Sequence, residues 1–353
     1  MSQATTQPEP ILEPDLPIVD PHHHLWIRPV AAVVEAPPPS HAFERVVRGV
    51  PRYLLDELIA DTRGAGHNVV ATVFVECGAM YRAYGPEAYR GVGETEFVNG
   101  VAAMSASGLF GPIRACAGIV SRADLMLGDE AAKVLEAHIA AGNGRFRGIR
   151  NSASFDEDSR VLGPLARYPA GLYRADAFRA GFKHLAKLGL SFDAWLLEPQ
   201  LPDLIDLARA FPDTTIVLDH VGTPLGIASY EGRRPERFDI WRDNVRALAK
   251  SDNVNVKLGG LAMAFCNFPS FLSDPPAPSA QLAEEWRPYI ETCIEAFGPD
   301  RCMFESNFPV DIGSCDYATL WNAMKRLAAG YSADDKTAMF SGTASRVYRL
   351  ELP

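Results

Sequence analysis

The sequence lacks an excess of basic residues: 34 Lys and Arg stand against 44 Asp and Glu, and the formal net charge is −10. This acidic balance does not offer the basic face that nucleic acid or an anionic membrane surface requires. The chain also lacks an apolar run long enough to form a membrane-spanning helix. We therefore expect neither a nucleic-acid partner nor a membrane partner.

Signals for secretion and for disulfide bonding are missing as well. Residues 1–17 have neither the basic start nor the apolar core of a signal peptide. The pattern of isolated cysteines, without any CxxC pair, is typical of reduced thiols in a cytoplasmic protein. The six cysteines are Cys77, Cys116, Cys266, Cys293, Cys302 and Cys315.

Several catalytic and nucleotide-binding motifs are absent from the chain. No GxGxxG or GxxxxGK[ST] follows an apolar run, which argues against the usual nucleotide sites. Neither HExxH nor the GxSxG nucleophile elbow occurs, which weakens an interpretation as a serine hydrolase. Only one histidine lies beyond residue 184, so a site built from four histidines and two metal ions is not available.

The chain does contain eight short apolar runs, and helical stretches follow most of them. Such runs indicate strands buried on both faces of a parallel sheet, and their alternation with helices implies βαβ units. Eight units predict an α/β fold, a single distorted (β/α)8 TIM barrel with long βα loops. An open doubly wound sheet is the alternative. The runs are Ile18–Asp20, Val69–Glu76, Ile113–Val120, Phe146–Arg150, Leu190–Leu197, Thr215–Asp219, Val254–Leu258 and Cys302–Glu305.

The domain organisation predicted from these runs is simple. We expect a flexible N-terminal arm over residues 1–17 and one barrel domain over residues 18–353. Three long loops, at residues 27–52, 78–97 and 262–280, are the candidates for setting specificity, because loops after the strands do so in this fold. Aromatic residues in these loops also predict a homodimer.

Ionisable residues stand where the predicted strands end, which is the catalytic face of a (β/α)8 barrel. His22 and His24 follow the first run, and alternate residues of a strand point to the same side. Both imidazoles are therefore expected in the barrel mouth, where they can share one metal ion or one substrate oxygen. His23 is expected to point the other way as a structural residue. His220 ends the sixth run, where a histidine indicates a general acid–base or a ligand.

Carboxylates, an arginine and aromatic residues complete the predicted site. Glu198 after the fifth run competes with Glu305 and Asp311 near the eighth run for the role of ligand or base. Arg150 ends the fourth run, where its guanidinium can hold a substrate carboxylate through two hydrogen bonds. The candidates for the pocket wall are Trp26, Tyr81 and Trp195.

Five motifs follow one another along the chain: Asp20-Pro21-His22-His23-His24-Leu25-Trp26, Phe146-Arg147-Gly148-Ile149-Arg150, Leu190-Ser191-Phe192-Asp193-Ala194-Trp195, Val217-Leu218-Asp219-His220-Val221-Gly222 and Glu305-Ser306-Asn307-Phe308-Pro309. As a set in this order they resemble the amidohydrolase-related family (amidohydrolase 2). More closely, they resemble its lactonase branch, which holds fuconolactonase-like and pyrone-dicarboxylate lactonase-like proteins. The similarity runs from about residue 17 to about residue 350.

The resemblance implies a distorted (β/α)8 barrel that hydrolyses lactones or related carboxylic derivatives. Metal-binding members of the family hold one divalent ion, often zinc, with a histidine pair on strand 1, a histidine on strand 5 and an aspartate on strand 8. The pair corresponds to His22 and His24 in this chain, and the family's histidine on strand 6 corresponds to His220. The chain departs from the pattern on strand 5, where Glu198 stands, and on strand 8, where Asn307 stands.

Two mechanisms remain open. In the first, His22, His24 and Glu198 bind one divalent ion, most readily zinc, and this ion activates water. His220 then stabilises the oxyanion or protonates the leaving oxygen. In the second, no metal binds, and Glu198 or Asp311 acts as the base while the histidines polarise the carbonyl group.

The expected function is therefore that of a hydrolase opening a lactone or related ester of a small organic acid. Arg150 favours an anionic substrate, and Asn307, which cannot take a proton, is expected to contact it. One alternative is a non-oxidative decarboxylase or hydratase of the same fold, which release of carbon dioxide would identify. The other is a barrel that has lost activity, although keeping so many ionisable groups buried without a function is costly.

Overall fold

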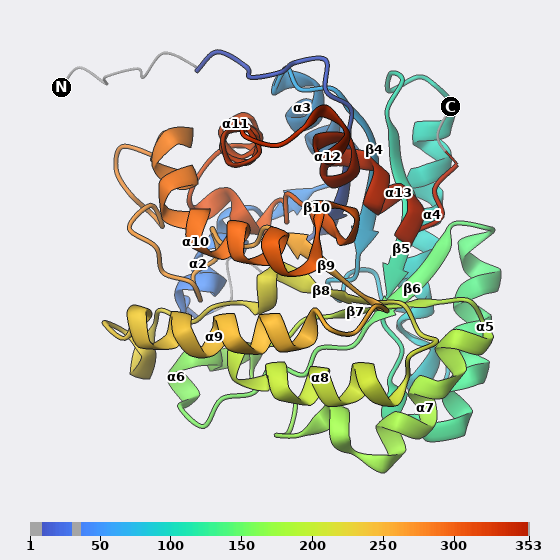
Figure 1. Cartoon of the computed structure of the whole chain (residues 1–353). Coiled ribbons are helices and arrows are strands. Elements are labelled where there is room, and N and C mark those ends of the chain that lie inside the picture. The colour runs from blue at the N-terminus through green and yellow to red at the C-terminus, as the bar shows by residue number, and fades with distance from the viewer. Residues whose placement is uncertain (1–8, 30–36, 352–353) are drawn as a thin grey trace.

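The computed structural model describes residues 9–29 and 37–351. Its centre is one sheet of eight strands, parallel to one another and hydrogen-bonded in chain order. The helices lie around the outside of this sheet (Figure 1). The strands are β1 (Ile18–His23), β4 (Val69–Val75), β5 (Arg114–Ser121), β6 (Phe146–Arg150), β7 (Ser191–Ala194), β8 (Ile216–Leu218), β9 (Val254–Leu258) and β10 (Cys302–Phe304).

A principal helix follows each strand, which confirms the predicted (β/α)8 barrel and makes the open-sheet alternative wrong. These helices are α3 (Leu55–Gly64), α4 (Val92–Ala106), α5 (Ala131–Gly142), α7 (Asp176–Lys187), α8 (Leu201–Ala210), α9 (Arg234–Leu248), α10 (Ser279–Phe297) and α11 (Tyr317–Leu327). Shorter elements are α2 (Ala42–Gly49), α6 (Ser159–Leu162), α12 (Ala333–Thr337), α13 (Thr343–Val347) and the antiparallel pair β2 (Trp26–Ile27) and β3 (Arg52–Tyr53).

The first and last strands meet, so the barrel is nearly closed. Beyond β10, the amide of Asn307 donates to the carbonyl of His22 at 2.9 Å, and the amide of His24 donates to the carbonyl of Phe308 at 2.8 Å. Closure brings the end of β1 beside the residues that follow β10. Residues far apart in the sequence therefore face one another across the mouth.

Side chains alternate between the barrel interior and the surrounding helices. In β4, Ala71, Val73 and Val75 belong to an apolar cluster that joins β1, β4, β5, β8 and β10 across the barrel. Phe74 belongs to the larger cluster beneath the helices. Both faces of the strand are thus buried, which is why it is almost continuously apolar in the sequence.

Apolar side chains from the loops after the strands cover the barrel mouth, and we call this cluster the roof. Its members come from loops that follow different strands, including two of the three loops expected to set specificity. Residues 30–36 of the first of these loops lie outside the described residues. The roof consists of Trp26, Val47, Val161, Leu162, Leu197, Leu225, Met263, Phe265 and Val310.

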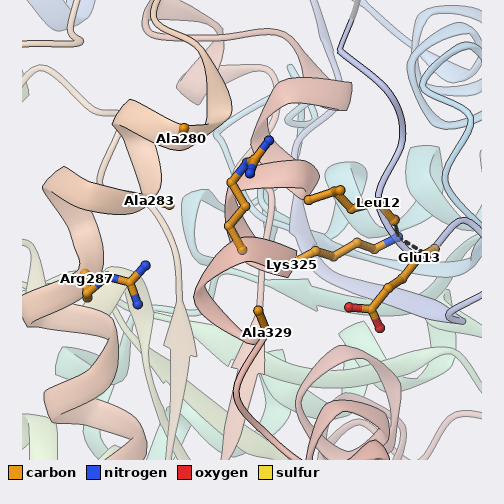
Figure 2. A pocket seen from close by; sticks show the side chains of 8 residues that line it. Leu12, Glu13, Ala280, Ala283, Arg287, Lys325 and Ala329 are labelled. Atoms are coloured by element: carbon orange, nitrogen blue, oxygen red, sulfur yellow. Dashed lines mark hydrogen bonds between the residues drawn. The ribbon is translucent and has the colours of Figure 1, made fainter.

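The N-terminal segment, expected to be a flexible arm over residues 1–17, is described only in part, because residues 1–8 lie outside the described residues. The described part of this segment is hydrogen-bonded to α11. Lys325 of that helix donates to the carbonyls of Leu12 and Glu13 at 2.9 and 2.8 Å. A pocket of about 510 Å³ lies between this segment, α10 and α11, with the Lys325 side chain reaching toward the segment (Figure 2). None of the expected site residues lines it.

Within the described ranges, no helix combines the length and the apolar character needed to cross a membrane. The six cysteines are all free, and five of them are buried. The cytoplasmic location and the homodimer stay predictions.

His23 is buried in the structure, and this burial changes the pKa of its ring. Its ring is fully buried, and its Nε2 atom lies 2.8 Å from the hydroxyl of Thr72. Burial disfavours the charged ring and lowers its pKa from 6.5 to about 3. The unfolded chain therefore binds a proton below about pH 6.5 that the folded chain binds only near pH 3. The stability that His23 contributes is present above pH 6.5 and is lost as the pH falls through this range.

We expect this linkage to appear in His23→Gln. The advantage of the wild type over the variant in free energy of unfolding should be about 1 kcal/mol smaller at pH 5.5 than at pH 7.5, because one pKa unit corresponds to about 1.4 kcal/mol. Urea denaturation of both proteins at the two pH values measures the difference. An advantage that stays the same at both pH values would show that His23 titrates normally in the folded protein.

Candidate active site

The carboxyl ends of the strands bring seven ionisable side chains into one buried group, which we call the mouth cluster. None of the seven exposes more than 6% of its surface. They come from six strands or the turns after them, so only the closed barrel assembles them. The mouth cluster consists of His22 in β1, Arg150 in β6, Asp193 in β7, Asp219 and His220 after β8, Lys257 in β9 and Glu305 after β10.

Glu305 lies between the two histidines. Its Oε1 atom is 2.7 Å from His220 Nδ1 and also accepts the amide of His220 at 3.2 Å. Its Oε2 atom is 2.9 Å from His22 Nδ1. His220 has a left-handed backbone with φ of 55°, a conformation that most residues avoid. The neighbouring Gly260 leaves room for the ring, because a Cβ atom there would lie 2.4 Å from His220 Nδ1.

Lys257 is the second organising residue of the mouth cluster. Its Nζ atom lies 2.6 Å from Asp193 Oδ2, 3.0 Å from Asp219 Oδ1 and 3.1 Å from His22 Nδ1. Asp193 also accepts a hydrogen bond from the hydroxyl of Tyr348 at 2.7 Å. Burial favours the neutral amine, but the surrounding carboxylates outweigh it and raise the pKa of Lys257 above its usual value.

His22 lies between two cationic donors. Ammonium and guanidinium groups can only donate, and Lys257 Nζ lies 3.1 Å from His22 Nδ1. Burial, together with the nearby ammonium, lowers the pKa of His22 to about 4, so this ring is neutral near pH 7. Arg150 Nη1 lies 3.3 Å from His22 Nε2. Both nitrogens of the His22 ring therefore lie beside a cationic donor.

The carboxylates beside these groups are ionised. Burial alone would raise the pKa of Glu305, but His220 and His22 outweigh it and lower the pKa to about 2. Asp219 is likewise penalised by burial, yet Lys257 and His22 hold its pKa well below the usual value. The mouth cluster therefore holds ionised carboxylates beside two imidazole rings. These groups can bind a metal ion, or one of them can act as a general base.

The residues present fit a divalent metal ion. Ligand atoms of His22, His220 and Glu305 all lie within 4.8 Å of one another. Two imidazoles and a carboxylate form a donor set used by catalytic zinc sites. Glu305 Oε2 is buried and accepts no hydrogen bond, so it is free to act as a ligand.

The expected ligand set was His22, His24 and Glu198. The ligand atoms that lie close together in the structure come from His22, His220 and Glu305. The strand ends at Ala194, not at the end of the apolar run, so Glu198 falls in the turn that begins the 3-10 helix Glu198–Gln200. There its carboxylate pairs with Arg237 at 2.6 Å. Burial raises the pKa of Glu198 to about 7, although Arg237 opposes this shift.

His24 lies near His22, with ring centroids 5.0 Å apart, but its nitrogens have other partners. Its Nδ1 lies 2.8 Å from the carbonyl of Val75, and its Nε2 lies 3.3 Å from Asn307 Oδ1. Asn307 in turn donates to Asp311 at 2.7 Å. Burial raises the pKa of Asp311 well above its usual value, although the hydrogen bond from Asn307 opposes the shift.

The other expected contact residues surround this group to differing extents. Arg150 donates to Glu76 Oε1 at 2.9 Å, so one edge of its guanidinium is already used. Trp195 is half-buried, with the Arg150 guanidinium 5.6 Å from its ring centroid. The Trp26 ring lies 6.2 Å from the His24 ring. Tyr81 is half-buried, and no hydrogen bond among the described residues joins it to the mouth cluster.

The sequence analysis did not predict a role for Asp193, Asp219 or Lys257, although all three stand in or beside the apolar runs. Their position in apolar runs could have indicated buried ion pairs. Charged residues are almost never fully buried unless paired, so a lysine within the run Val254–Leu258 requires a carboxylate opposite it. Their pairing could not be read from the sequence, because it depends on which strands face one another.

Comparisons with known proteins identify the family of this chain. The amidohydrolase family model matches residues 19–350. The chain is 34% identical over 339 residues to the uncharacterized protein y4mH of Sinorhizobium fredii, covering 95% of this chain and 99% of that protein. It is 29% identical over 214 residues to an L-fucono-1,5-lactonase of Burkholderia multivorans, covering 59% of this chain and 64% of that enzyme.

A solved structure extends the similarity to the whole barrel. An amidohydrolase from Burkholderia multivorans with bound zinc superposes with a TM-score of 0.68 at 25% sequence identity. The match covers 95% of this chain and 99% of that structure. The resemblance expected from the five strand-end motifs is thereby confirmed.

Proposed function

Because the chain belongs to the amidohydrolase family and is a hydrolase-type enzyme, we propose that it hydrolyses the ring ester of a lactone. The observation that carries this proposal is the buried pair of His220 and Glu305. An ionised carboxylate can only accept, so His220 Nδ1 donates to it. His220 Nε2 is then left with its lone pair, as in other carboxylate–histidine pairs that act as general bases.

The first chemical step is the attack of water on the lactone carbonyl carbon. His220 Nε2 takes a proton from that water, and Glu305 stabilises the imidazolium that forms. The tetrahedral intermediate then collapses, the bond from the carbonyl carbon to the ring oxygen breaks, and His220 returns the proton to that oxygen. The products are a carboxylic acid and a hydroxyl group on one open chain.

The developing oxyanion needs a donor, and Arg150 supplies it. The guanidinium is always protonated, and its Nη1 atom lies in the mouth 3.3 Å from His22 Nε2. Buried donors aimed at developing charge stabilise the transition state strongly. A divalent ion held by His22, His220 and Glu305 would replace His220 as the group that activates water, because it would supply Lewis-acid polarisation and a bound water of lowered pKa.

The charges of the site favour a neutral lactone. Lys257 is paired with Asp193 and Asp219, and Arg150 is paired with Glu76. A substrate carboxylate would therefore find no unpaired cation in the mouth cluster, in contrast to the anionic substrate expected from Arg150 alone. The L-fucono-1,5-lactonase that this chain resembles supports the same choice.

The proposal is tested with tag-free protein and three probes. L-Fucono-1,5-lactone is the neutral lactone, 2-pyrone-4,6-dicarboxylate is the anionic lactone, and 5-carboxyvanillate reports decarboxylation. Acid release is followed with a pH indicator, and carbon dioxide release is followed separately. We expect the neutral lactone to be opened fastest. Carbon dioxide release without ring opening would contradict the proposal and favour the decarboxylase alternative.

A further inference from the structure

The ammonium group of Lys257 is surrounded by the kinds of side chain that also bind metal ions in proteins. Its Nζ atom donates to Asp193 Oδ2 at 2.6 Å, lies within hydrogen-bond distance of His22 Nδ1 at 3.1 Å and forms an ion pair with Asp219 Oδ1 at 3.0 Å. These acceptors come from β7, the turn after β8, and β1. All three are fully buried. Two carboxylates and one imidazole thus surround a positive charge that belongs to the chain itself.

The position of this charge matters because Lys257 contacts His22, which also belongs to the candidate metal site. His22 belongs to the group of His22, His220 and Glu305 whose ligand atoms converge. Its Nδ1 atom faces Glu305 Oε2 at 2.9 Å and Lys257 Nζ at 3.1 Å. A divalent ion bound through this nitrogen would displace the hydrogen bond from Lys257 and lie beside a like charge.

We propose that Lys257 is a built-in cation that takes over part of a metal ion's electrostatic role in the barrel mouth and thereby weakens the binding of divalent metal at His22, His220 and Glu305. This inference concerns metal affinity and does not depend on which ester the enzyme hydrolyses. It assigns to Lys257 a positioning role, because the residue acts through His22.

A second buried lysine provides a matched control. Lys325 also lies near a histidine, with Nζ 2.9 Å from His67 Nδ1, and also has two oxygen acceptors. Those oxygens are backbone carbonyls of Leu12 and Glu13, not carboxylates. Replacing Lys325 therefore removes a buried ammonium of similar surroundings without changing the charge of the mouth cluster.

The test compares Lys257→Met with the wild type and with Lys325→Met. Each metal-stripped protein is titrated with Zn²⁺ and with Mn²⁺ by calorimetry, and its Tm is recorded with and without each ion. We expect Lys257→Met to bind metal at least about tenfold more tightly than the wild type and to gain Tm on addition of metal. Lys325→Met should bind metal as the wild type does. Lys257→Arg keeps the charge and should gain no affinity.

An unchanged or weaker affinity in a folded Lys257→Met protein would overturn the inference and leave Lys257 as a structural residue. A gain of equal size in Lys325→Met would overturn it as well. If Lys257→Met does not fold alone, refolding is repeated with each ion present. Recovery of the native fold with metal supports the inference, and failure to recover overturns it.

Discussion

Glu305→Gln is expected to lower kcat/KM for lactone hydrolysis by about 10³-fold, the range seen when a catalytic acid–base group loses its partner. The amide keeps the size of the side chain but removes the charge that stabilises the His220 imidazolium. It also changes the proton arrangement, because an amide nitrogen would donate toward a histidine nitrogen. Steady-state kinetics of acid release measure the loss.

Glu198→Gln is the matched control for Glu305→Gln. Glu198 is also a buried carboxylate near the barrel mouth, but its partner is Arg237 and not a histidine. We expect this variant to keep kcat/KM within about threefold of the wild type, because its carboxylate does not belong to the mouth cluster. Equal losses in the two variants would contradict the assignment of Glu305 and restore Glu198 as a candidate base.

Asp193→Leu is expected to lower the free energy of unfolding by about 3–5 kcal/mol, the cost of removing one partner from a buried ion pair. The change leaves the ammonium of Lys257 without its 2.6 Å partner and the hydroxyl of Tyr348 without its acceptor. Urea denaturation measures the loss, provided that the dependence of free energy on urea concentration stays the same.

A surface pair supplies the comparison for this stability measurement. Asp206 pairs with Arg179 on the outside of the barrel, and its side chain is 56% exposed. Asp206→Leu should lower the free energy of unfolding by at most about 1 kcal/mol, because water screens exposed ion pairs. A loss of similar size in both variants would show that the buried pair of Asp193 and Lys257 is no more important to folding than a surface pair.

The barrel could be predicted because its strands are buried on both faces. Two apolar runs coincide with strands, Phe146–Arg150 with β6 and Val254–Leu258 with β9. The carboxyl ends of such runs also indicate the catalytic face, because parallel strands of a closed barrel all end at the same side. The sequence predicts His22, Arg150 and His220 at that face, and the structure brings these three residues together.

Glu198 could not be placed from the sequence because its apolar run continues past the strand. Leu197 belongs to the roof and is as buried as a strand residue, so hydrophobicity alone does not reveal that β7 ends at Ala194. The inward-facing carboxylate of this strand is therefore Asp193. Its partner Lys257 is two strands away, and that pairing follows from closure of the barrel.

The most direct test of the proposed function measures acid release from L-fucono-1,5-lactone by the wild type and by His220→Asn in the same buffer. We expect turnover well above spontaneous hydrolysis in the wild type and a loss of about 10²-fold or more in the variant, whose side chain cannot take a proton from water. Ring opening at the same rate in both proteins, or in neither above the spontaneous rate, would contradict it.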